Sequence, residues 1–442
     1  MKVKLIKTRK LAWKIIYNAI SNNKRLSDIT KETMAKSSLN DRDKRFIIDL
    51  VQGIIRMKAR LSWELKKIYT NNWEELDLKV KIVLWIGAYQ MKYMDKIPNY
   101  AIVSTCVSLT KEIYFKTSGI VNALLRKYSL ICDLDKRISM KDKDWADFVS
   151  HPRWLVEKWS KTYSSSDLES LCNWNNKKPV IWFRLNLMQM SLNERNIYLN
   201  ENDFEFENWK YDDIFFKVNH TSRLLNSQIF NQGKISIQNP AAGLVVRLLN
   251  PKKRECIVDT CAALGGKTSF MSQLMKNTGK IYAYDSDINR LNTFVKGISK
   301  LKVDNVDAAV ADMTRYKLQR STKIIADVPC TGTGVMSKRA DLRWRRTLGN
   351  LYELVNIQKA ILNNSSESLM KNGVLVYSTC SIEYEENWGV INQFLDIKSN
   401  WVVDSADKYI PKEYVDSKGA LNIFPPKHNI DGGFAVRLIR RK

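Results

Sequence analysis

The stretch that decides the fold is Glu255–Thr268, which reads ECIVDTCAALGGKT. An apolar run typical of a buried strand ends at Asp259, and a pair of glycines, Gly265 and Gly266, follows shortly after it. Adjacent glycines permit a tight turn and let the backbone approach a ligand closely. The helix expected next has free amide N–H groups at its start, which suit a carboxylate or a phosphate. The stretch therefore predicts a strand, a binding loop and a helix.

The same alternation of strands and helices continues downstream. The expected strands are Glu255–Asp259, Lys280–Asp285, Val306–Asp312, Lys323–Asp327 and Gly373–Cys380. Helical stretches, among them Thr268–Lys276 and Leu351–Met370, lie between them. Strands separated by helices imply βαβ units and a parallel, doubly wound sheet. Residues 231–442 are therefore predicted to form a Rossmann-like α/β domain.

The chain upstream of this domain shows two other patterns. Over residues 1–130, apolar positions such as Leu11, Ile15 and Ala19 recur at helical spacing, which predicts an all-helical domain. Residues 131–230 mix the signals of helices with one strand-like run at 180–186, VIWFRLN. We expect this second region to be a small α/β connector, so that the whole chain is a multidomain protein.

The charge of the chain is strongly positive. There are 72 Lys and Arg residues against 46 Asp and Glu residues, a formal net charge of +26. Such an excess attracts polyphosphates, and the resulting binding weakens steeply with salt. The composition therefore favours a nucleic-acid partner, although a lysine-rich proteome would give a similar excess.

Cysteine and histidine usage argues against several classes of site. The seven cysteines include no CxxC pair, and the three histidines are far apart in the chain. A disulfide framework, a structural zinc site and a histidine-based metal site are therefore not expected. The first residues lack the apolar run and cleavage site of a signal peptide, and no run of about 18 apolar residues occurs, so we expect neither a signal peptide nor a membrane span. We expect a cytosolic protein without a transmembrane helix.

Three cofactors could use the glycine loop. A phosphate loop needs GxxxxGK[ST], but Cys261 stands where its first glycine belongs, and the GxGxxG of dinucleotide folds is missing. S-adenosylmethionine is the third, because its carboxylate would meet the glycine turn. Asp285 could then accept hydrogen bonds from both ribose hydroxyls, and Asp312 one from the adenine amino group. Each aspartate alone is more often a solvated turn or helix cap, but successive strand ends favour adenosine binding.

Two cysteines lie at the ends of the last two expected strands, Cys330 shortly after Asp327 and Cys380 as the last residue of Gly373–Cys380. A single buried cysteine is usually a core residue, but two at neighbouring strand ends would face one pocket. Two thiols suit methylation of cytosine at C5, since thiolate addition to C6 makes C5 nucleophilic. Asp327, if protonated, would ease this addition by protonating the ring near N3. The residues alone do not decide which cysteine attacks.

Several segments resemble motifs of the RsmB/NOP/Sun family of RNA cytosine-5 methyltransferases. Those in the α/β region are Ile237–Ala241, Cys261–Thr268, Asp327–Gly334, Arg339–Trp344, Ser378–Ile382, Glu385–Asn387, Phe424–His428 and Asp431–Phe434. Those similar to a NusB-like RNA-binding domain are Asp41–Arg42, Gly53–Arg56, Gly87–Gln90, Ile97–Pro98 and Val121–Arg126. The fusion of the two resembles the bacterial enzymes that act on small-subunit (16S) ribosomal RNA.

This resemblance implies a role for each site residue. Cys380 would be the nucleophile, Cys330 would assist product release, and Asp327 would polarise the base. The implied contacts to S-adenosylmethionine are Cys261, Ala262, Ala263, Leu264, Gly265, Gly266, Lys267, Asp285, Asp312 and Asp327. The implied C-terminal fold is that of a class I methyltransferase, and the implied partner is RNA. Apart from the resemblance, we expect no metal, no membrane and a monomeric state.

Three positions depart from the family pattern, and two rival functions stay open. Leu264 stands where proline is usual, Val328 where alanine is usual and Asn239 where aspartate is typical. None is a reacting group, so we expect altered affinity without loss of activity. One rival is a catalytically inactive RNA-binding or ribosome-assembly protein, against which both Cys330 and Cys380 argue. The other is a nucleotide-dependent enzyme with a phosphate loop.

Overall fold

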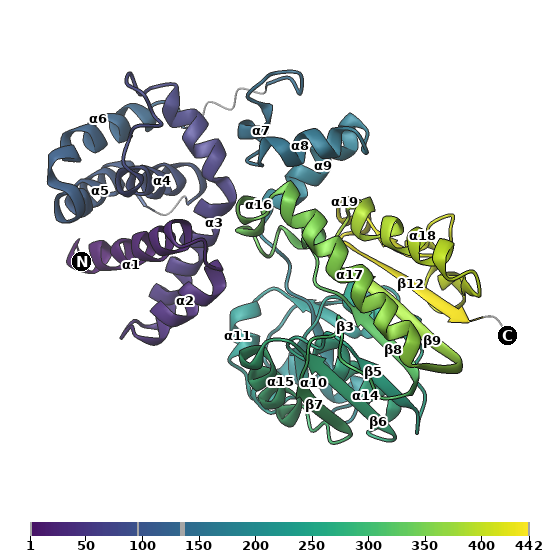
Figure 1. The fold of residues 1–442 in the computed structure, drawn as a ribbon. Helices are drawn as coiled ribbons and strands as arrows, with labels where there is room; N and C mark the ends of the chain where they lie inside the picture. Colours follow the sequence, from purple (N-terminus) through teal and green to yellow (C-terminus); the bar gives the residue numbers. More distant parts are fainter. Residues whose placement is uncertain (1, 95–96, 133–137, 441–442) are drawn as a thin grey trace. The chain divides into compact units, whose positions relative to one another are not determined.

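A computed structural model describes residues 2–94, 97–132 and 138–440 of the chain. The chain divides into two compact units (Figure 1). The first consists of Met1–Lys178 with Met336–Arg345, and the second of Pro179–Val335 with Arg346–Lys442.

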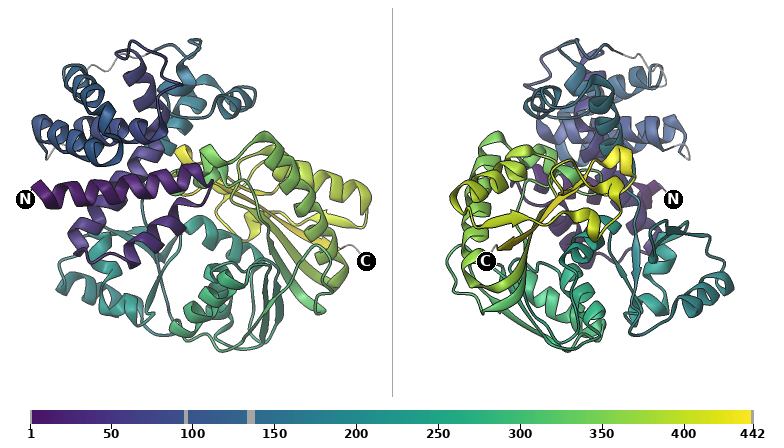
Figure 2. Two further views of the ribbon diagram at one scale, coloured as in Figure 1. Left: turned by 60° about the vertical axis from the view of Figure 1, so that its left-hand side comes forward. Right: turned by 90° about the vertical axis from the view of Figure 1, so that its right-hand side faces the viewer.

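The first unit is helical throughout its described residues (Figures 1 and 2). Its elements are α1 (Lys2–Ser21), α2 (Leu26–Ala35), α3 (Asp41–Lys66), α4 (Leu78–Tyr93), α5 (Asn99–Tyr114), η1 (Phe115–Thr117), α6 (Ser118–Tyr128), α7 (Trp145–Phe148), α8 (Arg153–Ser160), α9 (Ser165–Asn176) and α16 (Leu342–Arg345). In α3, Asn40 caps the first turn and the apolar residues Leu50, Ile54 and Leu61 are fully buried. The all-helical fold predicted for the N-terminal region is confirmed.

The segment Met336–Arg345 packs into this helical unit, although in the chain it lies between two strands of the second unit. Ala340 is fully buried in the helical core. The guanidinium of Arg343, also fully buried, donates to the carbonyl of Ser150 at 2.9 Å and to that of Asn175 at 2.8 Å. No pattern in the sequence indicated that these residues complete the helical unit.

The second unit contains a small antiparallel sheet of order β2-β3-β1-β4. Its strands are β1 (Phe183–Leu185), β2 (Phe206–Trp209), β3 (Asp212–Val218) and β4 (Ile235–Ile237), accompanied by α10 (Leu192–Glu201), α11 (Thr221–Leu225) and α12 (Gln228–Asn231). The strand-like run at 180–186 contains β1. The mixed α/β character predicted for 131–230 is found only from Pro179 onward, because the described residues before it belong to the helical unit, and β4 extends the small sheet beyond residue 230.

The large sheet has the order β10-β12-β9-β8-β5-β6-β7, with β11 paired to β12. Its strands are β5 (Cys256–Asp259), β6 (Lys280–Asp285), β7 (Val306–Val310), β8 (Ser321–Asp327), β9 (Leu369–Thr379), β10 (Trp401–Val403), β11 (Leu421–Ile423) and β12 (Gly433–Arg440). The helices of this part are α13 (Pro240–Leu249), α14 (Gly266–Met275), α15 (Ile288–Lys300), α17 (Leu348–Ser368), α18 (Trp388–Ile397) and α19 (Pro425–His428), with short 3-10 turns η2 (Thr333–Val335), η3 (Tyr384–Glu386), η4 (Ala406–Lys408) and η5 (Lys412–Tyr414). The Rossmann-like class is confirmed.

Five strands, from β5 to β9, run parallel as predicted. The antiparallel edge formed by β10, β11 and β12 was not predicted. Most of β12 is buried without alternation, and such a short apolar run does not by itself reveal a strand or its direction.

The strand order places the predicted site residues along one edge of the sheet. β5 lies between β6 and β8. The chain first adds β6 and β7 on one side of β5 and then crosses over to add β8 and β9 on the other side. Ligands of such sheets bind outside the carboxyl ends of the strands at this switch point. Asp259, Asp285, Asp327 and Thr379 end β5, β6, β8 and β9, respectively.

Candidate active site

The glycine loop turns sharply between β5 and α14. The N–H of Ala262 donates to the carbonyl of Tyr284 on the next strand at 2.8 Å, and Gly265 donates back to Ala262 at 2.9 Å. Gly265 has a φ of +84°, and a Cβ there would lie 2.8 Å from the ring of Phe294. Only glycine fits this position without a displacement of its neighbours. Since α14 begins at Gly266, the first amides of the helix face the end of β5.

Asp285, at the end of β6, is held by the backbone around it. Its Oδ2 accepts from the N–H of Ala263 at 3.0 Å, and its Oδ1 accepts from the N–H of Asp287 at 2.8 Å. Arg290 lies 3.3 Å from Oδ1. A carboxylate offers about four acceptor sites, so with three of them occupied about one is left for a ribose hydroxyl. The residue thus joins the second strand to the glycine loop.

Asp312 has a different environment. Its carboxylate is exposed and caps its own turn, because Oδ1 accepts from the N–H and the hydroxyl of Thr314 at 3.0 and 2.7 Å. These hydrogen bonds lower the pKa of Asp312. This geometry is the solvated turn that is the ordinary role of an aspartate after a strand.

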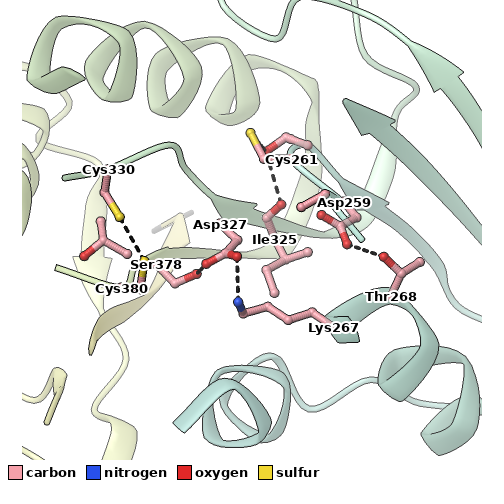
Figure 3. Close-up of polar contacts among 12 residues, drawn as sticks. Asp259, Cys261, Lys267, Thr268, Ile325, Asp327, Cys330, Ser378 and Cys380 are labelled. Carbon is pink, nitrogen blue, oxygen red and sulfur yellow. Dashed lines mark hydrogen bonds and ion pairs between the residues drawn. The ribbon is translucent and has the colours of Figure 1, made fainter. Parts of the chain in front are cut away.

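Asp259 lies beneath the loop and is fully enclosed. Its Oδ2 accepts from the hydroxyl of Thr268 at 2.6 Å (Figure 3). Burial raises the pKa of Asp259 to about 7. In a phosphate loop, the equivalent of Thr268 would bind Mg²⁺ and the preceding lysine would reach phosphates. Here Thr268 is buried against Asp259, which speaks against that rival; no pattern in the sequence had assigned Asp259 a role.

Lys267 reaches across the sheet edge to Asp327. Its Nζ lies 2.6 Å from Oδ2 of Asp327, and the hydroxyl of Ser378 donates to Oδ1 at 2.7 Å (Figure 3). Burial alone would lower the pKa of Lys267, but the charge of Asp327 and their hydrogen bond outweigh it and raise this pKa. Cys380 adds to the effect. The sequence placed Lys267 in the cofactor loop only and did not indicate this pair.

The two cysteines predicted to share a pocket come together. The sulfurs of Cys330 and Cys380 lie 3.2 Å apart, within hydrogen-bonding distance for thiols (Figure 3). Both residues are partly exposed. A ligand at the end of β8 and β9 can therefore meet two sulfurs, an ammonium and a carboxylate.

Buried hydroxyl groups join the loops that carry the two cysteines. The hydroxyl of Ser381 lies 3.2 Å from that of Thr331 and 3.1 Å from that of Thr333. Glu386, fully buried in η3, accepts the N–H of Thr331 at 2.8 Å and the side-chain amide of Gln358 at 2.9 Å. These groups fix the spacing of the two loops. Glu386 lies in one of the motifs visible in the sequence, but its role there was not predicted.

A close backbone contact joins the loop after Cys330 to Cys380 and to Gly432. Gly334 donates to the carbonyl of Cys380 at 3.0 Å and accepts from the N–H of Gly432 at 2.9 Å. A Cβ on Gly334 would lie 2.6 Å from the backbone of Gly432. Both glycines of this contact belong to the motifs that carry the family resemblance.

Three family models match the chain. The model described as 16S rRNA methyltransferase RsmB/F matches residues 246–439, the NusB family model residues 6–129, and the ferredoxin-like domain of RsmF/B-like methyltransferases residues 151–214. The chain belongs to the RsmB/F family. Members of this family are S-adenosylmethionine-dependent RNA methyltransferases, and this chain is one of them.

Similar proteins match over their whole length. A probable ribosomal RNA small subunit methyltransferase B from Synechocystis is 29% identical, covering 98% of this chain and 99% of that protein. The probable methyltransferase B of Bacillus subtilis is 27% identical over 96% of each chain. The methyltransferase B of Cronobacter sakazakii is 27% identical over 99% of this chain and 100% of that protein.

Solved structures show the same fold. A methyltransferase homolog protein from Pyrococcus horikoshii has a TM-score of 0.60 and 27% identity, covering 69% of this chain and all of that one. The protein PH0851 has a TM-score of 0.79 with 23% identity, covering 98% of this chain and 99% of that one.

The three departures from the RsmB/F pattern have simple structural accounts. Asn239 caps α13, and its Oδ1 accepts from the N–H groups of Ala241 at 3.0 Å and Asp431 at 3.2 Å. An asparagine offers the same carbonyl oxygen as an aspartate would. Leu264 is 60% exposed at the tip of the loop, and Val328 is packed in the sheet core. None of the three side chains is one of the polar groups at the sheet edge.

Two further findings concern the described part of the chain. Among residues 2–94, 97–132 and 138–440, no three or more histidine, cysteine or acidic side chains are grouped so that they could hold a metal ion. No helix within those same ranges combines the length and apolar character needed to cross a bilayer.

Proposed function

We propose that this RsmB/F protein methylates C5 of a cytosine in small-subunit (16S) ribosomal RNA through a covalent bond between Cys380 and C6. The observation that carries the proposal is the pair of sulfurs 3.2 Å apart at strand ends, with the Lys267–Asp327 ion pair beside Cys380. Methylation of a cytosine at C5 needs this combination of groups. One thiolate adds to C6, a proton donor serves N3, and a second group assists removal of the proton from C5.

The donor set at the sheet edge fits S-adenosylmethionine. The first amides of α14 suit its carboxylate, and Asp285 suits a ribose hydroxyl. Around these two groups, the loop from Cys261 to Lys267 would enclose the methionine part, with Asp327 near the reacting end. Asp312 is the proposed contact to adenine. When bound, the cofactor supplies an electrophilic methyl group at the edge where the sulfurs lie.

The addition step assigns roles to three side chains. The Cys380 thiolate, stabilised by the Lys267 ammonium, forms a bond to C6 of the cytosine. The electrons of the C5=C6 double bond move to C4–C5, and those of the N3=C4 double bond end on N3, which takes a proton. The Lys267–Asp327 pair supplies that proton. C5 is then an enamine carbon, able to accept the methyl group.

The release step reverses the addition. Methyl transfer restores the N3=C4 double bond, and the N3 proton returns to the Lys267–Asp327 pair. The C5 proton passes to Cys330, which gives its own proton to the sulfur of Cys380 as the C6–S bond breaks, and the electron pair left on C5 re-forms the C5=C6 double bond. Cys330, 3.2 Å from Cys380, is the group we assign to assist this step. Separate groups for addition and release split one hard reaction into easier ones.

The RNA partner is inferred from the charge, the N-terminal domain and the relatives. The net charge of +26 favours phosphate backbones. We propose residues 1–130 as an RNA-binding domain, 131–230 as a connector and 231–442 as the methyltransferase domain. The relatives from Synechocystis and Bacillus subtilis are named for the small ribosomal subunit. A monomeric state and a cytoplasmic location stay predictions.

A pair of variants tests the mechanism. With ribosomal RNA and S-adenosylmethionine, Cys380→Ala should give neither product nor a covalent protein–RNA adduct. Cys330→Ala should accumulate an adduct that resists denaturant, because addition proceeds and release does not. An adduct formed by Cys380→Ala would refute the assignment of the nucleophile.

Bisulfite mapping tests the substrate. Ribosomal RNA from cells with and without the protein should differ at a cytosine of the small subunit. Unchanged RNA, together with intact RNA binding, would instead favour the catalytically inactive assembly protein.

A further inference from the structure

The two sulfurs of the site are chemically alike, yet different charged side chains act on them. Lys267 interacts electrostatically with Cys380. Glu386 accepts from the N–H of Thr331, the residue that follows Cys330, at 2.8 Å, and its charge is one of the causes that raise the pKa of Cys330. A positive charge favours a nearby thiolate and a negative charge disfavours one. The pair is therefore asymmetric before any RNA binds.

Glu386 is held in place as an acceptor. Its Oε1 accepts from the N–H of Thr331 at 2.8 Å and from the amide of Gln358 at 2.9 Å, and its Oε2 accepts from the hydroxyl of Thr331. All three donors are neutral, and the described residues include no ion pair to this carboxylate. An ionised carboxylate is satisfied by donors alone. Its negative charge is thus balanced by dipoles only, next to the residue that follows Cys330.

Several other charged and titratable groups surround the thiol pair. They are Tyr377 on β9, Glu386 on η3, Asp327 on β8, Lys267 on α14 and Arg346 before α17. Arg346 donates to the backbone carbonyl of Cys330 at 3.1 Å, whereas the Lys267 ammonium is bound to Asp327. The hydrogen bond to Cys380, burial, and the charges of Cys380 and Glu386 together raise the pKa of Cys330 well above its ordinary value.

We propose that Glu386 is a positioning residue that keeps the proton of the thiol pair on Cys330, so that Cys380 is the thiolate that attacks C6. The inference rests on the proposed cytosine methylation and explains which of two adjacent thiols acts as nucleophile. The Cys330 S–H donates to the Cys380 thiolate, and no proton is gained or lost by the pair. When Cys380 adds to the ring, its charge passes to the base and is neutralised at N3, while Cys330 still holds its proton.

Alkylation of Cys330 tests this without RNA. In the Cys380→Ala protein, the rate at which iodoacetamide modifies Cys330 is followed against pH, with the modified peptide identified by mass spectrometry. Adding Glu386→Gln, which keeps the shape and an acceptor oxygen, should move the midpoint of this profile down by about one pH unit. Glu386→Asp keeps the charge and should stay near the parent profile. Glu385→Gln, one residue earlier, is the matched control and should not move it.

Two results would overturn the inference. One is an unchanged midpoint in Glu386→Gln. The other is an equal displacement of the midpoint in Glu386→Gln and Glu386→Asp, which would mean that Glu386 acts only by holding the loop. Thermal unfolding followed by circular dichroism identifies a variant that has lost its fold, and in that case the Arg346→Gln variant, which removes the cation beside Cys330 and keeps a donor for its carbonyl, must raise the midpoint for the inference to stand.

A second readout separates this inference from the proposed function. In protein that retains both cysteines, Glu386→Gln should direct part of the RNA adduct from Cys380 to Cys330, as mapped by peptide analysis. If neither cysteine forms an adduct while the midpoint of alkylation still moves, the proposed reaction fails and the role of Glu386 in the thiol pair holds.

Discussion

The two sides of the site are built in different ways. On the side of β8 and β9, Asp327 is bound by the side chains of Lys267 and Ser378, which come from separate elements. On the side of β6, Asp285 is bound mainly by the backbone of Ala263 and Asp287, and Arg290 lies 3.3 Å from it. A pair of side chains such as Lys267 and Asp327 can exchange protons with a ligand. Backbone amides can bind a ligand but do not exchange protons with it during a reaction. Substitutions should therefore change turnover on the first side and cofactor affinity on the second.

The largest effect is expected at Lys267. Replacing it with methionine removes the cation beside Cys380 and the partner of Asp327. General acid–base groups contribute about 10²–10⁴-fold to rate, so single-turnover methylation should fall by about a thousandfold. The dissociation constant of S-adenosylmethionine, measured by calorimetry, should change far less. Lys276→Met, at the exposed end of the same helix, is the control.

The contrast between the two sides fails if the Lys267→Met protein loses cofactor binding as strongly as it loses rate. Lys267 would then act mainly in binding the cofactor, the role expected of Asp285.

The next effect concerns stability and comes from Asp259. Because burial raises its pKa from 3.8 to about 7, the buried carboxyl stabilises the fold fully below pH 4, and this contribution is lost as the pH rises through 7. A difference of one between the folded and unfolded pKa corresponds to about 1.4 kcal/mol. The free energy of unfolding should therefore fall by about 2–3 kcal/mol between pH 5 and pH 8 from this group alone.

Urea unfolding of Asp259→Asn at the two pH values checks this. The variant should lack that part of the pH dependence, whatever its absolute stability. Equal pH dependence in both proteins would show that Asp259 is not the group responsible.

A smaller effect is expected at Asp285, on the side of the site that should bind the cofactor. Asp285→Asn keeps the size of the side chain but removes its charge. Hydrogen bonds to a charged group contribute about 1.5–3 kcal/mol, so the dissociation constant of S-adenosylmethionine should rise roughly 10–100-fold. The rate at saturating cofactor should stay near that of the unchanged protein. A large fall in that rate would show that Asp285 takes part in the reaction as well as in binding the cofactor.

The smallest effect is expected at Asp312. Its carboxylate is exposed and already caps its own turn. A hydrogen bond from the adenine amino group to such a carboxylate contributes about 0.5–1.5 kcal/mol, so Asp312→Asn should weaken cofactor binding no more than about tenfold. A loss equal to that of Asp285→Asn would show that the two aspartates hold the nucleoside together.

The strand ends were predictable from the sequence, but their partners were not. Apolar runs that stop at Asp259, Asp285 and Asp327 mark where strands end, and parallel strands bring such ends to one edge. No periodicity shows that β8 lies beside β5, with two strands intervening in the chain, and this adjacency is what brings Lys267 to Asp327. Pairs across a sheet depend on strand order, which local patterns do not contain.

Buried polar groups were the other gap. Glu386 and Thr331 lie in motifs visible in the sequence, but a carboxylate balanced by an amide and hydroxyls has no fixed spacing. Met336–Arg345 shows the same limit, because its helical turn is too short for periodicity to indicate which core covers it. The resemblance marks such positions without giving their contacts.

The placement of Met336–Arg345 has a consequence for synthesis on the ribosome. Domains generally fold as units, beginning from the N-terminus while the chain is still being made. Here the carbonyls of Ser150 and Asn175 lack their donor, the Arg343 guanidinium, until Arg343 has been translated, long after Lys178. The helical unit reaches its final form only when β8 and the Cys330 loop already exist. Nascent chains halted before Arg343 should therefore be cut more readily by protease within the helical unit than chains halted beyond Arg345.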